Sequence, residues 1–507
     1  MTDKLKLEKT LWAAADKLRN NMDAAEYKHV VLGLIFLKYI SDTFDDLYNQ
    51  IDNEKHITNL NPEDKQLYVE NKIFYVPPQA RWKWLYGRSK FPTIGNDIDD
   101  AMEALERDNP SLKDVLPKDY SRSALDKQRL GELIDLISSI TLSKNGSGKG
   151  KDVLGFVFEY FLGQFAAAEG KKGGQFYTPQ SIVKLLVEML EPEPRKVVYD
   201  GCCGSGGMFV QSERFIEIHE HRKGEIAIFG QESNPTTYRL AKMNLAIRGI
   251  DAHIELGDTL LHDKFPTLKA DYILANPPFN VSDYRINNSD KKWKYGIPPT
   301  GNANYAWLQH FADKLSTNGI AGIVLSNGSM SSGIATEREI RKNFIESDLV
   351  ECIVALPSQL FYNTQIPACL WLLSQNKEEG KYRNRTNEVL FIDARETGIM
   401  ISRTQKELED NDDISRIAEV YHSWRQKDDK YKDVPGFCRS TNTHEIRKNN
   451  YILTPGRYVQ HKEVVNNDIP FEEKMNALTA TLKTQLEDSS NLELNIIKSL
   501  KSLGYEL

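Results

Sequence analysis

The chain has 507 residues, of which 40% are hydrophobic and 27% are charged. At roughly 150 residues per domain, this length allows two to four domains with cores of their own. The composition excludes disordered, collagen-like and small disulfide-stapled proteins. Lys and Arg number 65 and Asp and Glu number 72, so the net charge of −7 provides no global positive field for nucleic acid or membranes. If nucleic acid is the substrate, the basic surface must be local or supplied by a partner.

The five cysteines are sparse and odd in number, so they form neither a disulfide framework nor a CxxC metal pair. We therefore expect a reducing, cytoplasmic setting and no metal site. The first residues include acidic side chains and lack the apolar core of a secretory signal. The longest apolar run, 30–40, contains Lys38 and is too short to span a bilayer, so we expect no membrane association.

Residues 1–145 are predicted to form an N-terminal helical domain. A capping-box-like pair, Asp23 and Glu26, precedes the apolar run 30–40, which has helical spacing. The polar stretch 143–151 has no apolar anchor and marks a domain boundary or a mobile loop. Other helical stretches are expected at 7–18, 47–67, 98–105 and 125–142.

Residues 152–400 are predicted to form an α/β domain. After an aromatic-rich helix at 156–165, short apolar runs alternate with helical segments, as is typical of βαβ units. This pattern predicts a Rossmann-like fold with a seven-stranded, mostly parallel sheet. Strands are expected at 197–199, 226–230, 253–256, 272–275, 320–326, 350–355 and 368–373.

Residues 401–507 are predicted to be a C-terminal region that ends in a helical tail for subunit docking. A further strand is expected at 388–392, before this region, and a helix over 405–424. From residue 471 an apolar stripe approaches coiled-coil spacing, which is typical of helix packing and, at this position, of a helix that faces a partner. The stripe consists of Met475, Leu478, Leu482, Leu486, Ile496, Leu500 and Leu503.

The segment 198–209 predicts a strand that ends at Asp200, a glycine-rich turn and a helix. Glycines in such a turn bring the backbone close to a ligand where side chains would clash. We therefore expect a nucleotide-type binding site here. Its turn residues are Gly204, Ser205, Gly206 and Gly207.

The spacing favours S-adenosylmethionine over NAD as the bound nucleotide. An NAD fingerprint requires glycine at the position of Phe209, and an acid roughly 20 residues after the loop, whereas the next strand-end acid, Glu232, lies further on. Asp200 precedes the glycines, as in S-adenosylmethionine-dependent methyltransferases. Glu232 is then expected to accept the ribose hydroxyls, and Asp258, after the third strand, the adenine amine.

The tetrapeptide Asn276, Pro277, Pro278 and Phe279 follows the fourth strand, at the edge where open α/β sheets bind ligands. Methyl transfer to an exocyclic amine requires the nitrogen lone pair to be freed from the base ring. The Asn276 side-chain oxygen and the Pro277 carbonyl can accept both amino hydrogens, and the prolines hold these acceptors rigid. Phe279 can stack on a base rotated out of a duplex. This chemistry requires no covalent nucleophile. Cys202 and Cys203 are therefore expected to pack beside the glycine turn and not to be catalytic.

This ordered set of motifs resembles the gamma-class adenine-N6 DNA methyltransferases. More closely, the chain resembles the modification subunit of type I restriction-modification systems over nearly its full length. The segments on which the two resemblances rest are 11–19, 32–40, 173–179, 200–207, 276–279 and 302–310.

The resemblance implies S-adenosyl-L-methionine as cofactor and adenine N6 in duplex DNA as the methyl acceptor. The family usually has Asp-Pro-Ala-Cys-Gly-Ser-Gly at the glycine loop, whereas this chain has Gly201 and Cys202 in place of Pro and Ala. That difference removes no contacting group. The residues implied to close over the methionine end of the cofactor are Gln175, Tyr177, Thr178 and Pro179.

The resemblance also implies partners: double-stranded DNA, a separate specificity subunit, a restriction subunit, and a second copy of this chain in the complex. The stretch after residue 374 is too short for two recognition domains of roughly 150 residues each. Basic residues that could contact phosphate, or equally form solvated faces, are Arg285, Lys291, Lys292, Lys294, Arg439, Arg447, Lys448 and Arg457.

Four alternatives fit the sequence less well. A free-standing DNA methyltransferase would need a recognition domain, which is missing. Cytosine-N4 transfer and protein glutamine methylation use similar Asn-Pro-Pro-aromatic chemistry but do not account for the helical N-terminal domain. A non-catalytic assembly protein is disfavoured by the intact tetrapeptide 276–279.

Overall fold

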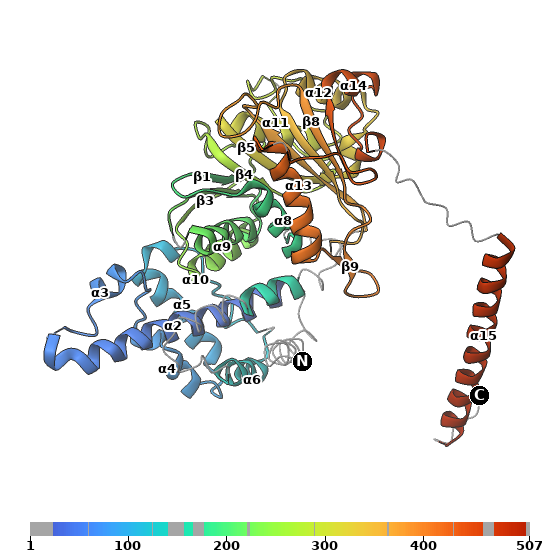
Figure 1. Cartoon of the computed structure of the whole chain (residues 1–507). Helices are drawn as coiled ribbons and strands as arrows, with labels where there is room; N and C mark the ends of the chain where they lie inside the picture. Colours follow the sequence, from blue (N-terminus) through green and yellow to red (C-terminus); the bar gives the residue numbers. More distant parts are fainter. Residues whose placement is uncertain are drawn as a thin grey trace. The chain divides into compact units, whose positions relative to one another are not determined.

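The computed structural model divides the chain into two compact units, Met1–Gln460 and His461–Leu507, each of which is described by itself (Figure 1). The predicted boundaries near residues 145 and 400 stay predictions. The described residues are 24–58, 60–123, 125–139, 157–165, 177–220, 224–287, 289–361, 365–428, 430–459 and 471–502.

The N-terminal part is helical, as predicted. The apolar run 30–40 lies inside the first long helix and is buried almost all round, because it packs against the helices that follow. The expected helix 47–67 is interrupted, since Pro62 lies between two helices and Asp64 caps the second one. The helices are α2 (Ala24–Thr58), α3 (Lys65–Glu70), α4 (Trp82–Gly87), α5 (Ile94–Asp108) and α6 (Lys127–Ser138).

Several predictions for this part fall outside the described residues. They are the apolar face at 7–18, the cap residue Asp23, the polar stretch 143–151 and the start of the aromatic-rich helix at 156. The remainder of that helix, 157–165, is helical and largely buried.

The seven strands predicted for the sheet are present, but the sheet has nine strands and not seven, in the order β11-β8-β6-β7-β5-β4-β1-β2-β3. The further strand predicted at 388–392 joins the sheet as β8, whereas β11 was not predicted. β7 is antiparallel to both of its neighbours and β11 is antiparallel to β8, whereas the other pairs are parallel. The strands are β1 (Val197–Asp200), β2 (Ala227–Glu232), β3 (Ala252–Leu256), β4 (Ala270–Ala275), β5 (Leu315–Ser326), β6 (Val350–Ala355), β7 (Ala368–Ser374), β8 (Glu388–Asp393) and β11 (Cys438–Asn442).

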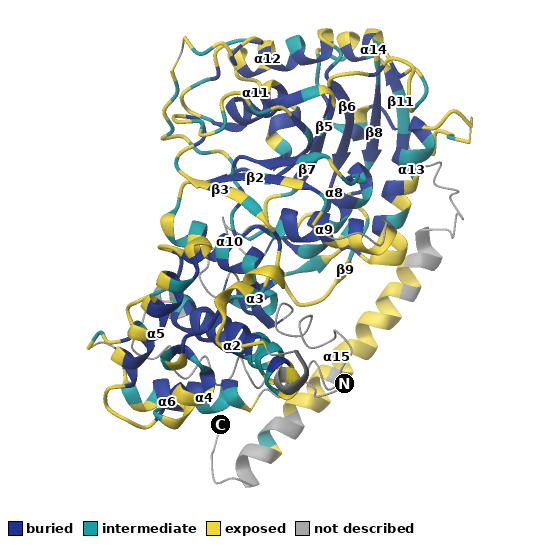
Figure 2. Ribbon diagram, turned by 90° about the vertical axis from the view of Figure 1, so that its left-hand side faces the viewer, coloured by how far each residue is buried: buried dark blue, intermediate teal, exposed yellow. Residues whose placement is uncertain are grey.

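Helices cover both faces of the sheet, so alternate strand residues enter two separate cores. Figure 2 shows the central strands buried, with exposed residues on the outer sides of the helices, in the loops and along the edge strand β3 (Ala252–Leu256). One face packs against α8 (Gln180–Leu190), α9 (Gly207–Glu220), α10 (Pro235–Ile247) and α13 (Ser415–Arg425). The other packs against α11 (Asn304–Lys314), α12 (Ala335–Glu346) and α14 (Thr443–Lys448).

The region expected to be helical over 405–424 differs from the prediction. Lys406–Glu407 forms the short strand β10, which pairs with β9 (Ile399–Met400), and α13 begins only at Ser415. The difference arises because Lys406 is tied through its backbone N–H to the carbonyl of Gln359, 2.9 Å away, which holds this segment extended.

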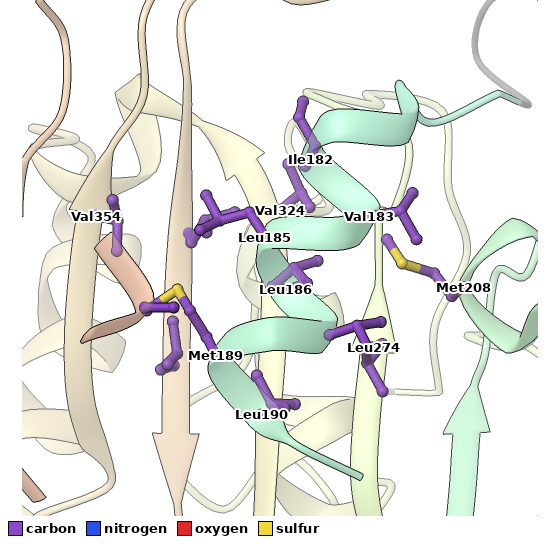
Figure 3. Packing of buried hydrophobic residues seen from close by; sticks show 14 of the residues in the cluster. Ile182, Val183, Leu185, Leu186, Met189, Leu190, Met208, Leu274, Val324 and Val354 are labelled. Carbon is purple, nitrogen blue, oxygen red and sulfur yellow. The ribbon is translucent and has the colours of Figure 1, made fainter. Parts of the chain in front are cut away.

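Helix α8 leads directly into the predicted cofactor site, and its position is fixed from two sides. Leu185, Leu186 and Met189 lie on the side that faces the strands (Figure 3). Gly322 of β5 permits the close approach, since a Cβ there would lie 2.6 Å from the Leu186 side chain. On its outer side the carbonyl of Glu188 accepts a hydrogen bond of 2.8 Å from His422 of α13.

The tail forms one helix, α15 (Phe471–Ser502), as predicted. Met475, Leu478, Leu482 and Leu486 are exposed within their unit. The other positions of the stripe, Ile496, Leu500 and Leu503, are not among the residues whose side chains the structure describes. None of the helices within the described ranges has the length and apolarity needed to cross a membrane.

We expect Leu186→Ala to lower the free energy of unfolding by about 2–5 kcal/mol, because it leaves a cavity between α8 and β5. Urea denaturation followed by circular dichroism measures the loss. Lys184→Ala on the same helix is the control, since it removes only a surface ion pair to Asp410 and should cost less than about 1 kcal/mol. Equal losses in the two variants would contradict the packing described here.

Candidate active site

Strands β3, β2, β1 and β4 are neighbours and parallel, so their carboxyl ends meet at one edge of the sheet. β1 ends at Asp200 and β2 at Glu232, while Asp258 follows β3 and Asn276 follows β4. The structure therefore brings the four predicted polar residues to the same edge.

A cleft opens at this edge between the glycine loop, the segment before α8 and the end of β4. Glu232, Asp258 and Phe279 do not line it. Among the described residues, no group of three or more His, Cys, Asp or Glu side chains is arranged to hold a metal. The cleft is lined by Glu159, Tyr177, Thr178, Gln180, Val183, Asp200, Cys202, Cys203, Gly204, Ser205, Gly207, Met208, Gln211 and Asn276.

The glycine loop has the conformation that its sequence requires. Gly204 and Gly206 have φ values of +55° and +80°, which side-chain-bearing residues rarely adopt. A Cβ at Gly207 would meet no atom within 4 Å, so the space in front of α9 is open. The loop therefore leaves room for a ligand against its backbone, as the sequence predicted.

The two strand-end acids beside the loop are buried and bonded to backbone N–H groups. Asp200 accepts from the N–H of Cys202 at 2.9 Å, and burial raises its pKa to about 7. Glu232 accepts from the N–H groups of Gly204 at 3.0 Å and Asn234 at 2.8 Å, and burial also raises its pKa. Glu232 thus supports the loop from behind; its contact with ribose stays a prediction.

Asp258 is exposed and caps the turn after β3. Its Oδ1 atom accepts from the N–H groups of Leu260 at 3.0 Å and Leu261 at 3.3 Å. Aspartate commonly accepts such backbone hydrogen bonds in turns. The contact of Asp258 with the adenine amine of the cofactor stays a prediction.

Asn276 is held in one orientation by a residue far away in sequence. Its Nδ2 donates to the Thr178 hydroxyl oxygen at 3.0 Å. Its Oδ1 is buried, and no group in the described part of the chain donates to it. Because an amide nitrogen can only donate, tying it to Thr178 leaves the oxygen as an acceptor reserved for a ligand. Thr178 was predicted as a cofactor residue; the sequence did not predict this contact with Asn276.

A family model described as N-6 DNA Methylase matches residues 149–467. The chain belongs to the N-6 DNA methylase family. A second model, described as HsdM N-terminal domain, matches residues 7–137. The predicted family, the enzyme class of adenine-specific DNA methyltransferases and the cofactor S-adenosylmethionine are thereby confirmed.

Several relatives of this methylase are named as methylase subunits of type I restriction enzymes. The HindI methylase subunit of a type I restriction enzyme from Haemophilus influenzae is 47% identical, over 85% of this chain and 100% of its own. The MjaIX methylase subunit from Methanocaldococcus jannaschii is 40% identical, over 98% of this chain and 91% of its own. A type I methyltransferase subunit from Streptococcus thermophilus has a solved structure with TM-score 0.76 and 25% identity, covering 90% of this chain and 100% of its own.

The last residue of the tetrapeptide 276–279, which was predicted to be catalytic, belongs to an aromatic pair. The Phe279 ring meets the ring of Phe361 edge to face, with centroids 5.5 Å apart. The following residue, Asn280, has a φ of +55°, and its side-chain oxygen accepts from Asn304 at 2.9 Å and Ser326 at 3.0 Å. These bonds tie the end of the tetrapeptide segment to α11 and β5.

The cleft also contains residues that the sequence did not indicate. Glu159, Gln180 and Gln211 come from three separate helices, 157–165, α8 and α9, and only the folded chain brings them to one cleft. Of these, Gln211 had a local signal, since it lies one turn into the helix that follows the glycine loop. The predicted residue Gln175 lies outside the described residues.

The surroundings of the two cysteines beside the loop favour packing over a nucleophilic role. Cys203 is buried, and the Cys202 thiol donates to Asp200 at 3.4 Å. Burial raises the pKa of both thiols well above its usual value, so both stay protonated. This agrees with the expectation that they pack.

The departure from the family pattern at Gly201 has a steric cause in this methylase. A Cβ at Gly201 would lie 2.8 Å from the Tyr199 hydroxyl oxygen and 3.1 Å from Thr259. That hydroxyl is in turn held by His310, 3.0 Å away and fully buried. Proline or alanine therefore does not fit at this position while Tyr199 is present.

We expect Gly201→Ala to destabilise the methylase by about 1–3 kcal/mol, because the added methyl group overpacks the space beneath the loop. Adding Tyr199→Phe removes the nearest atom and should restore part of the loss. Thermal unfolding of the two single variants and the double variant measures this coupling. Additive losses would show that the two residues do not compete for the same space.

Proposed function

We propose that this methylase transfers a methyl group to the N6 atom of an adenine rotated out of duplex DNA, with residues 276–279 as its catalytic segment. The observation that supports this most directly is the buried Asn276 Oδ1, which has no donor among the described residues. A buried acceptor left unpaired costs about 1–3 kcal/mol, so its retention suits a donor that arrives with the substrate. The exocyclic amine of adenine is such a donor.

The residues of the cleft have distinct roles in this reaction. S-adenosylmethionine supplies a methyl group on a positively charged sulfur. Thr178 holds the Asn276 amide so that Oδ1 accepts one amino hydrogen, and the Pro277 carbonyl accepts the other. These acceptors favour a tetrahedral nitrogen as its lone pair attacks, and they stabilise the positive charge that develops on it. The backbone of Gly204 and Gly206 leaves room for the cofactor alongside.

Phe279 and Phe361 form an apolar wall next to these acceptors. Stacking on an aromatic ring contributes about 1–3 kcal/mol per base, which offsets part of the cost of leaving the duplex. We assign Phe279 to contact with the base face and Phe361 to support from behind, because Phe361 is buried whereas Phe279 is half-buried.

The methylase is proposed to act in a type I complex with a separate specificity subunit, two copies of itself and a restriction subunit. The names of its relatives support the subunit type. The helix α15 supports a docking role, since Leu478, Leu482 and Leu486 are more than half exposed. We place the complex in the cytoplasm, where its DNA substrate lies.

Contacts to the DNA backbone are proposed for only some of the basic residues. Lys292 is buried against the carbonyl of Leu260, while Arg439 and Arg447 pair with Glu445 and Glu346. These three are structural. Arg285, Lys291 and Lys294 are exposed and follow the catalytic segment in the chain, so they are the better candidates for phosphate contacts.

The function is tested by incubating the protein with radiolabelled S-adenosylmethionine and duplex DNA, with and without its co-encoded specificity subunit. We expect sequence-specific label on adenine N6 only when that subunit is present. Label on cytosine or on protein would overturn the assignment of the substrate. Full sequence-specific activity of the protein alone would overturn the assignment of the partner.

We expect Asn276→Ala to lower kcat by about 100- to 1000-fold while changing cofactor affinity less than about two-fold, because it removes an acceptor used during transfer. Thr178→Val keeps the side-chain shape but loses the hydroxyl, so it should lower kcat less than Asn276→Ala does. Thr178→Ser keeps the hydroxyl and should have a kcat close to that of the wild type. Asn318→Ala, at the amino end of β5, is the control and should behave as the wild type. Wild-type kcat in Asn276→Ala would show that the mechanism is wrong.

A further inference from the structure

The described cleft lining contains acidic but no basic side chains. Its carboxyl groups are those of Glu159, which pairs with Arg248 at 3.4 Å, and Asp200, whose pKa is raised by burial to about 7. Such a lining suits the positively charged sulfur and ammonium group of S-adenosylmethionine. The same molecule also has a carboxylate, for which this lining offers no cation. Among the described lining residues, the groups that can bind this carboxylate are therefore neutral N–H and O–H donors.

Gln211 is the donor in this lining that lacks an acceptor. Its side chain lies on α9 and is only 5% exposed, and its Nε2 atom is buried without a hydrogen-bond partner among the described residues. Buried polar atoms are nearly always paired, so an unpaired donor in a ligand cleft indicates a group that the ligand satisfies. Val183 and Met208 also line the cleft, and these apolar side chains offer it no strong acceptor (Figure 3).

The start of α9 adds further donors close by. α9 begins at Gly207, and the N–H groups of a first helical turn have no partner within their own helix. They also lie at the positive end of the helix dipole, which favours an anion. Since a Cβ at Gly207 would meet no atom within 4 Å, a ligand group can approach this helix end.

We infer that Gln211 is a cofactor-binding residue whose Nε2 donates to the carboxylate of the methionine part of S-adenosylmethionine, together with the first N–H groups of α9. This inference deepens the proposed function, because it assigns the anionic end of the cofactor within the same cleft. Of the described side chains that line the cleft, two have a buried atom without a partner in the described part of the chain: Asn276 has an acceptor and Gln211 a donor. The first is complementary to the amine of the base and the second to the carboxylate of the cofactor.

The test is calorimetric binding to the full chain without DNA, so it does not depend on methyl transfer. The ligands are S-adenosylmethionine and its decarboxylated form, which keeps the ammonium group. The wild type should bind the decarboxylated form about ten-fold or more weakly. Gln211→Met has similar length but no N–H, so it should lose about 10- to 100-fold in affinity for S-adenosylmethionine and little for the decarboxylated form.

Two further variants complete the experiment. Gln211→Glu places a negative charge next to the carboxylate and should bind S-adenosylmethionine more weakly than Gln211→Met does. Ser212→Ala on the same helix removes only a hydroxyl that donates to the Met208 carbonyl at 2.9 Å, and should keep wild-type affinity. Thermal unfolding of each free protein checks that the fold is intact.

The outcomes separate this inference from the proposed function. Equal wild-type affinity for both ligands would overturn carboxylate recognition without any variant. Unchanged affinity in Gln211→Met would overturn the role of this side chain, and wild-type affinity in Gln211→Glu would show that it faces the ammonium group instead. None of these outcomes would overturn the proposed function, because that function is tested separately by the methylation of adenine in DNA.

Discussion

The hydrogen bond from Asn276 Nδ2 to the Thr178 hydroxyl is the contact on which the proposed catalytic site depends. An amide side chain can present either a donor or an acceptor, and only an acceptor can draw hydrogens from an amine. Thr178 determines which is presented. Its own position follows from α8, which starts two residues later and is packed against β5 on one side and α13 on the other. The chemistry of one oxygen atom thus rests on the packing of a whole helix.

Burial and charge act together in the cleft. Asp200 and Glu232 are removed from water, which raises the pKa of each, and backbone N–H groups of the glycine loop and its neighbours partly compensate. Of the two, Asp200 lines the cleft. In the proposed site, a cofactor with a positively charged sulfur favours the ionised form of Asp200, and this attraction is lost when the sulfur becomes neutral after transfer. The proposed site therefore holds the product less strongly than the substrate.

Sequence patterns predicted the parts of the fold that are locally determined. The seven strands are apolar runs, and the glycine loop combines a strand end, a turn and a helix start within a dozen residues. β11 was not predicted, because its sequence, Cys-Arg-Ser-Thr-Asn, is polar and it forms a strand only by pairing with β8. The helix expected over 405–424 was placed too early for a similar reason, since tertiary contacts hold its first residues extended.

The same distinction holds for the site. Motifs indicated Asp200, Gly204 and Asn276, because each follows a strand whose carboxyl end must reach one edge of the sheet. Thr178 with Asn276, and Phe279 with Phe361, are pairs from distant segments, and no periodicity relates them. The unpaired Nε2 atom of Gln211 and the steric requirement for Gly201 emerge only when side chains are placed in three dimensions.

The contact between α8 and α13 has a consequence for biosynthesis. α8 precedes the first strand of the sheet, yet the helix that covers its outer side comes from residues 415–425. A chain emerging from the ribosome can therefore form the strands around the cofactor loop while one side of α8 is still bare. This leaves an apolar surface exposed for a large part of translation, during which a chaperone can bind it. The packing around α8 is complete only when α13, which is synthesised more than 200 residues later, covers its outer side.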